Sequence, residues 1–381
     1  MTLRRIAGIL LLLSSAASAQ QAAHKPATGS VTGYVMCADT QRPARFASIM
    51  LIPKDAGKSQ PQPGASAGVE AHSGLDGTYT VTDVPVGDYY ALAQLSGYAL
   101  PIKMMANAKD AEDAEKALAD IPLIHVAADR SVTANLTLIR GAVITGQVLF
   151  DDGMPVINAV VRLESIEGVD PEQVVYMGIL RFASESAYYS STDYRGGYSF
   201  VGVRPGKYHA FVEITAQGGV SVHGNFYSPD RMQMIRLYAP GKFHQRDAQV
   251  IEVKGSEEIP GTDMKLSLDA THTVSGRVLS REDGHAPNHA FVSLQDAVDK
   301  TFRLSVTADA DGEFHLRYVP EGTYLLSAQA ADGGDLKDAN NPRSYDVLRR
   351  YERQTVSVIV TNQDIKIDDV MMEPSKIRES K

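Results

Sequence analysis

Apolar and polar residues alternate along most of the chain, and the same arrangement returns three times. Each copy opens with an apolar, a hydroxyl, a glycine, a variable and an apolar residue, at residues 31–35, 144–148 and 274–278. Such alternation is typical of a half-buried β-strand. The central glycine indicates a close backbone approach or a bulge. The pattern therefore predicts an equivalent opening strand in each copy.

A second element follows in each copy at constant spacing. A turn containing glycine precedes a short alternating strand, and a second turn then leads to a tyrosine. The turn glycine and this tyrosine are twelve residues apart in every copy, as Gly77 and Tyr89, Gly196 and Tyr208, and Gly312 and Tyr324. Glycine tolerates the positive φ that tight turns need. By analogy with Greek-key sandwiches, the tyrosine hydroxyl is expected to pin the preceding loop.

Each copy is expected to end in two short strands, and a repeat of this length predicts an array of similar domains. We expect an all-β chain of three tandem seven-stranded Greek-key β-sandwich domains. Short joints between them predict a semi-rigid rod. The expected divisions are a signal peptide at 1–19, a linker at 20–28, domains at 29–140, 141–270 and 271–374, and a tail at 375–381.

Three segments interrupt this pattern. Residues 54–70 are rich in Gly, Pro, Ser and Gln and predict a loop. Residues 169–189 form a longer insertion in the second copy. Residues 107–120 are rich in Ala, Glu, Asp and Lys and predict a short surface helix. Because the copies otherwise agree, function is expected where they differ.

The N-terminus has the pattern of a secretory signal peptide. Arg4 and Arg5 precede the apolar run 6–13, and Ala19 ends a small-residue cleavage site. That run is shorter than the roughly 20 apolar residues of a membrane-spanning helix, and no later run reaches this length. The sequence therefore predicts a secreted or periplasmic protein without a membrane span.

Charge and cysteine content narrow the partners further. The chain has 37 basic and 46 acidic residues, a net charge of −9, which argues against nucleic acid or an anionic membrane as partner. Cys37 is the single cysteine, so an intramolecular disulfide is excluded. We expect Cys37 to be a small apolar side chain on the first strand.

The opening strand, the Asp-Gly-x-aromatic turn and the Val-Pro-x-Gly-x-Tyr element together resemble the carboxypeptidase regulatory-like domain. This domain is a transthyretin-like (prealbumin-like) sandwich, similar to the B-type repeats of bacterial adhesins. The resemblance covers nearly all of the chain after residue 19. It implies accessory binding modules, and it does not imply one activity.

The sequence contains no recognisable catalytic or metal-binding pattern. None of the ten histidines is followed three residues later by glutamate, and the nucleophile-elbow and phosphate-loop patterns are absent. Asp309 and Asp311 alternate as in a calcium loop, but a strand follows where further ligands are needed. We therefore expect turn chemistry there, and no enzyme activity, metal or cofactor.

The candidate ligand surface is the aromatic group Phe182, Tyr188, Tyr189 and Tyr194. Exposed aromatic faces bind sugar rings or partner side chains at little entropic cost. The alternative is that these rings alternate into the core of the second domain. Two functions stay open: protein–protein interaction or a structural role at the cell surface, and polysaccharide binding by a starch-binding-like (carbohydrate-binding-like) sandwich.

Overall fold

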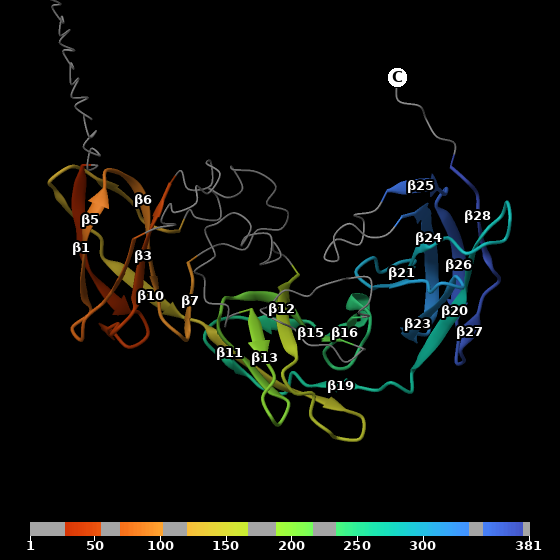
Figure 1. Cartoon of the computed structure of the whole chain (residues 1–381). Helices are drawn as coiled ribbons and strands as arrows, with labels where there is room; N and C mark the ends of the chain where they lie inside the picture. Colours follow the sequence, from red (N-terminus) through yellow and green to blue (C-terminus); the bar gives the residue numbers. More distant parts are fainter. Residues whose placement is uncertain are drawn as a thin grey trace, which may run out of the picture.

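The computed structural model shows an all-β protein. Its strands form three pairs of sheets in chain order (Figure 1), which we call the N-terminal unit (28–140), the middle unit (142–266) and the C-terminal unit (271–372). The expected signal peptide, nearly all of the expected helix at 107–120 and most of both insertions lie outside the described residues. The structure describes residues 27–54, 69–101, 120–166, 188–215, 234–334 and 346–375.

In the N-terminal unit β1 is central to one sheet, where β2, β5, β9 and β10 pair with it and β7 pairs with β10. The facing sheet has the order β4-β3-β6-β8. The strands are β1 (Thr28–Cys37), β2 (Arg42–Pro43), β3 (Ser48–Pro53), β4 (Val69–His72), β5 (Thr78–Pro85), β6 (Gly87–Gln94), β7 (Tyr98–Ala99), β8 (Leu123–Val126), β9 (Ser131–Thr133) and β10 (Leu136–Arg140).

In the middle unit β14, β18 and β19 pair with the central β11, and the facing sheet runs β13-β12-β15-β16, with β17 also on β15. A 3-10 turn, η2 (Gln245–Asp247), follows β16. The strands are β11 (Ala142–Phe150), β12 (Val160–Ser165), β13 (Tyr189–Ser191), β14 (Gly197–Val203), β15 (Gly206–Thr215), β16 (Met234–Tyr238), β17 (Ile251–Val253), β18 (Glu258–Ile259) and β19 (Met264–Leu266).

The C-terminal unit repeats this plan. The strands β23, β27 and β28 pair with the central β20, and the facing sheet runs β22-β21-β24-β25, with β26 also on β24. The strands are β20 (Thr271–Ser280), β21 (His289–Asp296), β22 (Arg303–Thr307), β23 (Glu313–Pro320), β24 (Gly322–Gly333), β25 (Val347–Arg350), β26 (Gln354–Val360), β27 (Ile365–Lys366) and β28 (Val370–Met372).

The expectation of seven strands per unit is wrong in number: the described residues form ten in the N-terminal unit and nine in each of the others. The last strand of every unit is broken into two short pieces that run parallel to the opening strand, such as β9 and β10 on β1. Short edge strands add the rest. The parallel pairing of the first and last strands joins distant parts of the chain, so no local sequence pattern predicts it.

Each unit has a separate hydrophobic core between its two sheets, built by the predicted alternation. In the middle unit, Ile144 of β11 and Phe200 of β14 face Leu163 of β12 and Val212 of β15, and all four are buried. Cys37 is buried in the core of the N-terminal unit, as predicted. Burial of this kind supplies most of the stability of a sandwich.

Two of the three glycines of the opening strands, Gly33 and Gly146, mark a close backbone approach, as predicted. A Cβ atom on Gly146 would lie 2.1 Å from the carbonyl oxygen of Thr262, and one on Gly33 would lie 1.9 Å from that of Ala134. Both carbonyls lie where the broken last strand passes β11 or β1. The hydroxyl of Tyr198 donates to the carbonyl of Thr262. The glycine and the tyrosine therefore hold the opening strand against the broken last strand.

The predicted tyrosine contacts are present in all three units. Each tyrosine hydroxyl donates to the carbonyl four residues earlier, which ties the turn to the strand that follows it. The pairs are Tyr89 with Pro85 (2.9 Å), Tyr208 with Arg204 (3.0 Å) and Tyr324 with Pro320 (2.8 Å). Burial raises the pKa of each of these phenols above its ordinary value, so the hydroxyls stay protonated donors at neutral pH.

The first joint, between the N-terminal and middle units, is made by backbone contact. At Gly202 φ is +87°, and a Cβ atom there would lie 2.9 Å from the carbonyl oxygen of Tyr98. The guanidinium of Arg204 donates to the carbonyl of Leu100 at 2.9 Å. A glycine is needed here because any side chain would separate the two units.

The second joint, between the middle and C-terminal units, is polar and buried. The turn η2 meets the hairpin between β21 and β22. The amide of Gln245 donates to Asp299 Oδ2 at 2.7 Å, and Arg246 Nη1 donates to Asp296 Oδ1 at 3.0 Å. The Asp296 side chain is 2% exposed. Hydrogen bonds to a buried carboxylate are among the stronger ones in proteins.

Aromatic packing closes the second joint. Phe243 packs against the cores of both the middle and the C-terminal unit. The buried ring of His244 lies 5.1 Å from the ring of Phe302, centroid to centroid, and its Nδ1 lies 3.6 Å from Asp296 Oδ2. Neither ring nitrogen of His244 has a hydrogen-bond partner among the described residues. The His244 ring therefore lies between an aromatic neighbour and a carboxylate.

The charge states of the second joint follow from burial and hydrogen bonding. Burial lowers the pKa of His244, and the nearby carboxylate of Asp296 opposes this shift. For Asp296 itself burial would raise the pKa, but the amides of Asp299 and Val298 and the guanidinium of Arg246 outweigh it and lower the pKa. At neutral pH a neutral imidazole therefore lies beside ionised carboxylates.

Candidate functional site

The structure separates the three described residues of the candidate ligand surface, Tyr188, Tyr189 and Tyr194. The ring of Tyr188 packs on Tyr208 in the core of the middle unit, with centroids 6.4 Å apart. Tyr194 is 69% exposed, in the turn between β13 and β14. Tyr189 is intermediate, with the Arg162 guanidinium 5.3 Å from its ring centroid. Phe182 lies outside the described residues.

Local structure explains these positions. Tyr189 begins β13, an edge strand that pairs with β12, so the preceding Tyr188 points to the opposite face of the sheet. Burial raises the pKa of the Tyr188 phenol. Tyr194 lies in a turn closed by Asp193, whose carboxylate accepts hydrogen bonds from the amides of Arg195 and Gly197, each at 2.8 Å. The turn therefore fixes the backbone and leaves the Tyr194 ring in solvent.

A polar hollow of about 610 Å³ lies beside this turn, on the outer face of β11 and β14. Hydroxyls, one carboxamide and two carboxylates line it, and no Lys, Arg or His of the described residues does. Thr145, Gln147, Ser191 and Ser199 make no side-chain hydrogen bond to another described residue. The lining residues are Thr145, Gly146, Gln147, Ser190, Ser191, Asp193, Gly197, Tyr198, Ser199, Gly261 and Asp263.

The hollow exists because short residues stand where the other units carry larger ones. Gln147 and its partner Gly197 occupy adjacent positions on β11 and β14. In the C-terminal unit the corresponding pair is Arg277 and Glu313, and Arg277 also bonds Asp369 across the surface at 2.6 Å. An exposed guanidinium and a carboxylate cover the sheet there. The middle unit leaves the same face open to a polar ligand.

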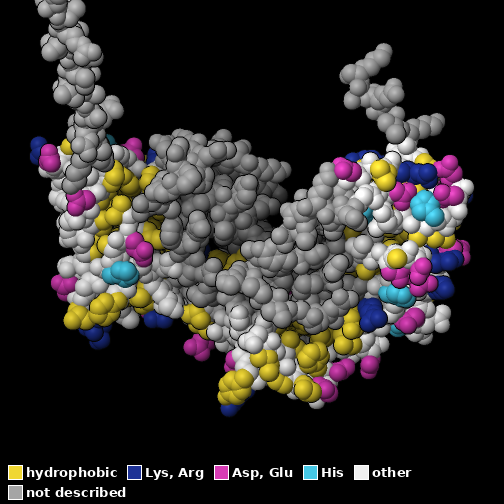
Figure 2. Space-filling view, viewed as in Figure 1, with side chains coloured by type: hydrophobic (Ala, Val, Ile, Leu, Met, Phe, Trp, Pro, Cys, Tyr) yellow, Lys and Arg dark blue, Asp and Glu magenta, His cyan; other side chains and the backbone are white. Residues whose placement is uncertain are grey.

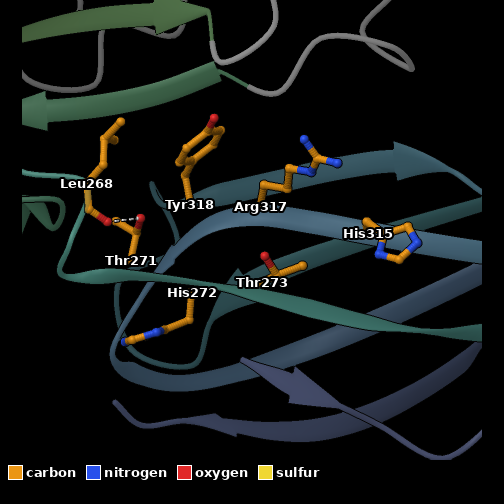
Figure 3. A pocket seen from close by; sticks show the side chains of 7 residues that line it. All are labelled: Leu268, Thr271, His272, Thr273, His315, Arg317 and Tyr318. Carbon is orange, nitrogen blue, oxygen red and sulfur yellow. Dashed lines mark hydrogen bonds between the residues drawn. The ribbon is translucent and has the colours of Figure 1, made fainter. Parts of the chain in front are cut away.

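A second hollow, of about 430 Å³, lies on the C-terminal unit near its junction with the middle unit. No carboxylate of the described part of the chain lines it. Leu268, Tyr318 and Arg317 project to one side of it, while His272 points away (Figure 3). Tyr318 has a left-handed backbone, with φ at +59°. The lining residues are Leu268, Thr271, His272, Thr273, His315, Arg317 and Tyr318.

The expected turn chemistry at Asp309 is confirmed. Its carboxylate accepts hydrogen bonds from the amides of Asp311 (3.0 Å) and Glu313 (2.8 Å), as the carboxylate of an Asx turn does. Gly312 has a φ of +78°, which explains the Asp-Gly pair. Within the described residues no group of three or more His, Cys, Asp or Glu side chains is arranged to hold a metal ion.

One polar cluster was not anticipated from the sequence. His285 bonds Asp283 through Nδ1 at 2.5 Å and Asp332 through Nε2 at 3.1 Å, and the hydroxyl of Tyr351 also donates to Asp332. The hydrogen bond to Asp283 is the largest cause of the raised pKa of His285. Both ring nitrogens are engaged, so the imidazole ties β24 to the turn after β20 and has no position left for a substrate.

No known protein family and no curated protein matches the chain. No helix among the described residues is long and apolar enough to cross a membrane.

Solved structures give weak, all-β likenesses. A streptococcal ancillary pilin is 11% identical, with 91% of this chain and 99% of that chain covered and a TM-score of 0.27. A proposed carbohydrate-binding protein of Pseudomonas aeruginosa is 15% identical over 26% of this chain and 88% of that one, with a TM-score of 0.20. The Bacillus anthracis TIE protein is 12% identical, with a TM-score of 0.21; 91% of this chain matches 51% of that protein, so the chain spans about half its length.

Proposed function

We propose that this is a secreted or periplasmic, non-enzymatic protein of carboxypeptidase regulatory-like domains that acts as a binding or spacer module at the cell surface. The domains are those expected from the sequence, at 29–140, 141–270 and 271–374. The observation that carries the proposal is the pair of joints. Each joint contains direct hydrogen bonds or buried charge, which a flexible linker between independent binding domains would not need.

At the first joint, the choice of residue as well as the contact itself supports a fixed arrangement of the two units. Gly202 has a positive φ. Asp83 and Tyr318, at the corresponding bulges of the other two units, also have a positive φ. Only the middle unit, where the backbone of Tyr98 from the N-terminal unit approaches this position, has a glycine there. This choice of residue indicates that the close approach of Tyr98 is a designed feature of the chain.

The polar hollow and Tyr194 favour polysaccharide binding as a second candidate. Sugar hydroxyls would find donors and acceptors in the hollow, and the Tyr194 ring, 69% exposed, is available for stacking beside it. The guanidinium of Arg195 lies 5.0 Å from the centroid of that ring, so one face is already covered. The chain also contains no tryptophan, the favoured stacking side chain. Surface interaction with protein is therefore the first proposal.

Retention on insoluble polysaccharides separates the two functions. For a spacer or protein-binding module we expect the chain to stay in the supernatant with cellulose, chitin, starch and peptidoglycan. Polysaccharide binding predicts retention that falls about tenfold with Tyr194→Ala, which corresponds to roughly 1.4 kcal/mol. Ile359→Ala is the matched control, since Ile359 is 65% exposed on the C-terminal unit. Retention lost only in the tyrosine variant would replace the first proposal with the second.

A further inference from the structure

The end of the N-terminal unit carries two large apolar side chains in solvent. Phe46 lies between β2 and β3 and is 65% exposed, and Leu75 lies between β4 and β5 and is 67% exposed. Their loops adjoin, since the amide of Phe46 donates to the carbonyl of Ser73 at 3.1 Å. We call Arg45, Phe46 and Leu75 the tip. Large apolar residues grouped on a surface mark an interaction site.

The backbone of Phe46 makes its presence there more informative. Its φ is +58°, in the left-handed region that bulky residues avoid. The corresponding residue of the middle unit is Asn158, whose φ is +55° and whose amide donates to the carbonyl of Thr192 at 3.1 Å. Asparagine suits this conformation and phenylalanine does not. The Phe46 side chain is still 65% exposed in this conformation, so we infer a contact outside the chain.

Hydrogen bonds beneath the tip lower the free-energy cost of removing its loops from water. Ser73, buried beneath it, donates through Oγ to the carbonyl of Ala44 at 2.6 Å and accepts from the amide of Ala47 at 2.9 Å. The amide of Ser73 in turn donates to the carbonyl of Ala47 at 2.9 Å. These bonds reduce the number of backbone groups that must lose water when the loop enters an apolar layer.

We propose that the tip inserts Phe46 and Leu75 into the interfacial layer of a lipid membrane. A convex tip enters a deformable layer without a complementary hole, whereas a protein partner would need one. The exposed Arg42 and Arg45 stand beside the apolar pair and match the phosphates of lipid headgroups. The net charge of −9 opposes attraction to an anionic surface, so apolar insertion carries the binding and a zwitterionic bilayer suffices.

The middle unit offers a weaker second contact of the same kind. Tyr194 and Ile157 are exposed in the corresponding loops, at 69% and 52%. The loop between β13 and β14 and the loops that end the N-terminal unit lie at the lower edge of the view in Figure 1, where Figure 2 shows hydrophobic side chains. The proposal goes beyond the spacer role and does not depend on the stiffness of the joints.

Flotation with vesicles tests the proposal. The chain without residues 1–19 is used, because the apolar run 6–13 would itself bind lipid. We expect it to float with vesicles of phosphatidylcholine alone. Phe46→Asn combined with Leu75→Ser should reduce the bound fraction about tenfold or more, since most of the inserted apolar surface is removed. Val298→Ser, at a residue 76% exposed on the C-terminal unit, should leave binding unchanged.

Three results would overturn the proposal. The first is that the chain floats with no vesicle. The second is that it floats only when phosphatidylglycerol is added, and that the double variant floats equally well. The third is that Val298→Ser reduces the bound fraction as much as the double variant does. A folding defect is distinguished by thermal unfolding, where Phe46→Asn should keep or raise the melting temperature because asparagine fits the left-handed backbone.

Discussion

Gly146→Ala should destabilise the middle unit by about 3 kcal/mol or more, because the added methyl group meets atoms that cannot move away. The new Cβ would lie 2.1 Å from the carbonyl oxygen of Thr262 and 2.8 Å from the hydroxyl of Tyr198, which donates to the same carbonyl. Either β11 separates from the last strand or the Tyr198 bond is lost. Urea unfolding followed by tyrosine fluorescence measures the loss.

The matched control is a glycine of the same unit that is not closely approached. A Cβ on Gly255 would meet only a side-chain oxygen of Glu257, at 3.5 Å, which is ordinary contact. We expect Gly255→Ala to change the free energy of unfolding by less than about 1 kcal/mol. If Gly146→Ala proves as stable as its control, the opening glycine does not mark a backbone contact and the account of the last strand is wrong.

Asp296→Ala should weaken the second joint and cost the C-terminal unit about 3 kcal/mol. The carboxylate accepts hydrogen bonds from the amides of Val298 (2.8 Å) and Asp299 (2.7 Å) as well as from Arg246 of the middle unit. With alanine these donors lose their acceptor, and the buried amide of Asp299 is left without a partner. Calorimetry should show a lower melting temperature for the C-terminal unit.

Asp369→Ala is the control for this prediction. Asp369 also bonds an arginine, Arg277, at 2.6 Å, but on the surface of the same unit. Exposed ion pairs contribute about 0–1 kcal/mol, so its loss should be small. Equal effects of the two substitutions would mean that the Asp296 contact is an ordinary surface pair and not part of a joint.

Local pattern was sufficient to predict the scaffold. The pattern predicted a close backbone approach at Gly146, a loop-pinning hydroxyl at Tyr208 and a tight turn at Gly312. The structure shows each of them in that role. The parallel pairing of β18 and β19 with β11 was not predicted, since over a hundred residues of chain separate the partners and neither strand carries a distinguishing pattern.

The candidate site was harder to predict because it depends on what is missing from a surface. Gln147, Gly197 and Gly261 leave the polar hollow open, and none of them stands out in the sequence. Alternation into β13 places Tyr188 against the core, but an edge strand of three residues gives too short a pattern to show which face is buried. The turn after β13 leaves Tyr194 in solvent. The second joint was missed because Gln245 and Asp299 are far apart in sequence.

The central claim is that the joints hold the units in a fixed arrangement. Spin labels at Lys265 and Glu313, both exposed and on either side of the second joint, report it by double electron–electron resonance after Cys37→Ala. The account predicts one narrow distance distribution that broadens with Asp296→Ala. A broad distribution in the parent chain, unchanged by that substitution, would show that the units move independently and would contradict the spacer function.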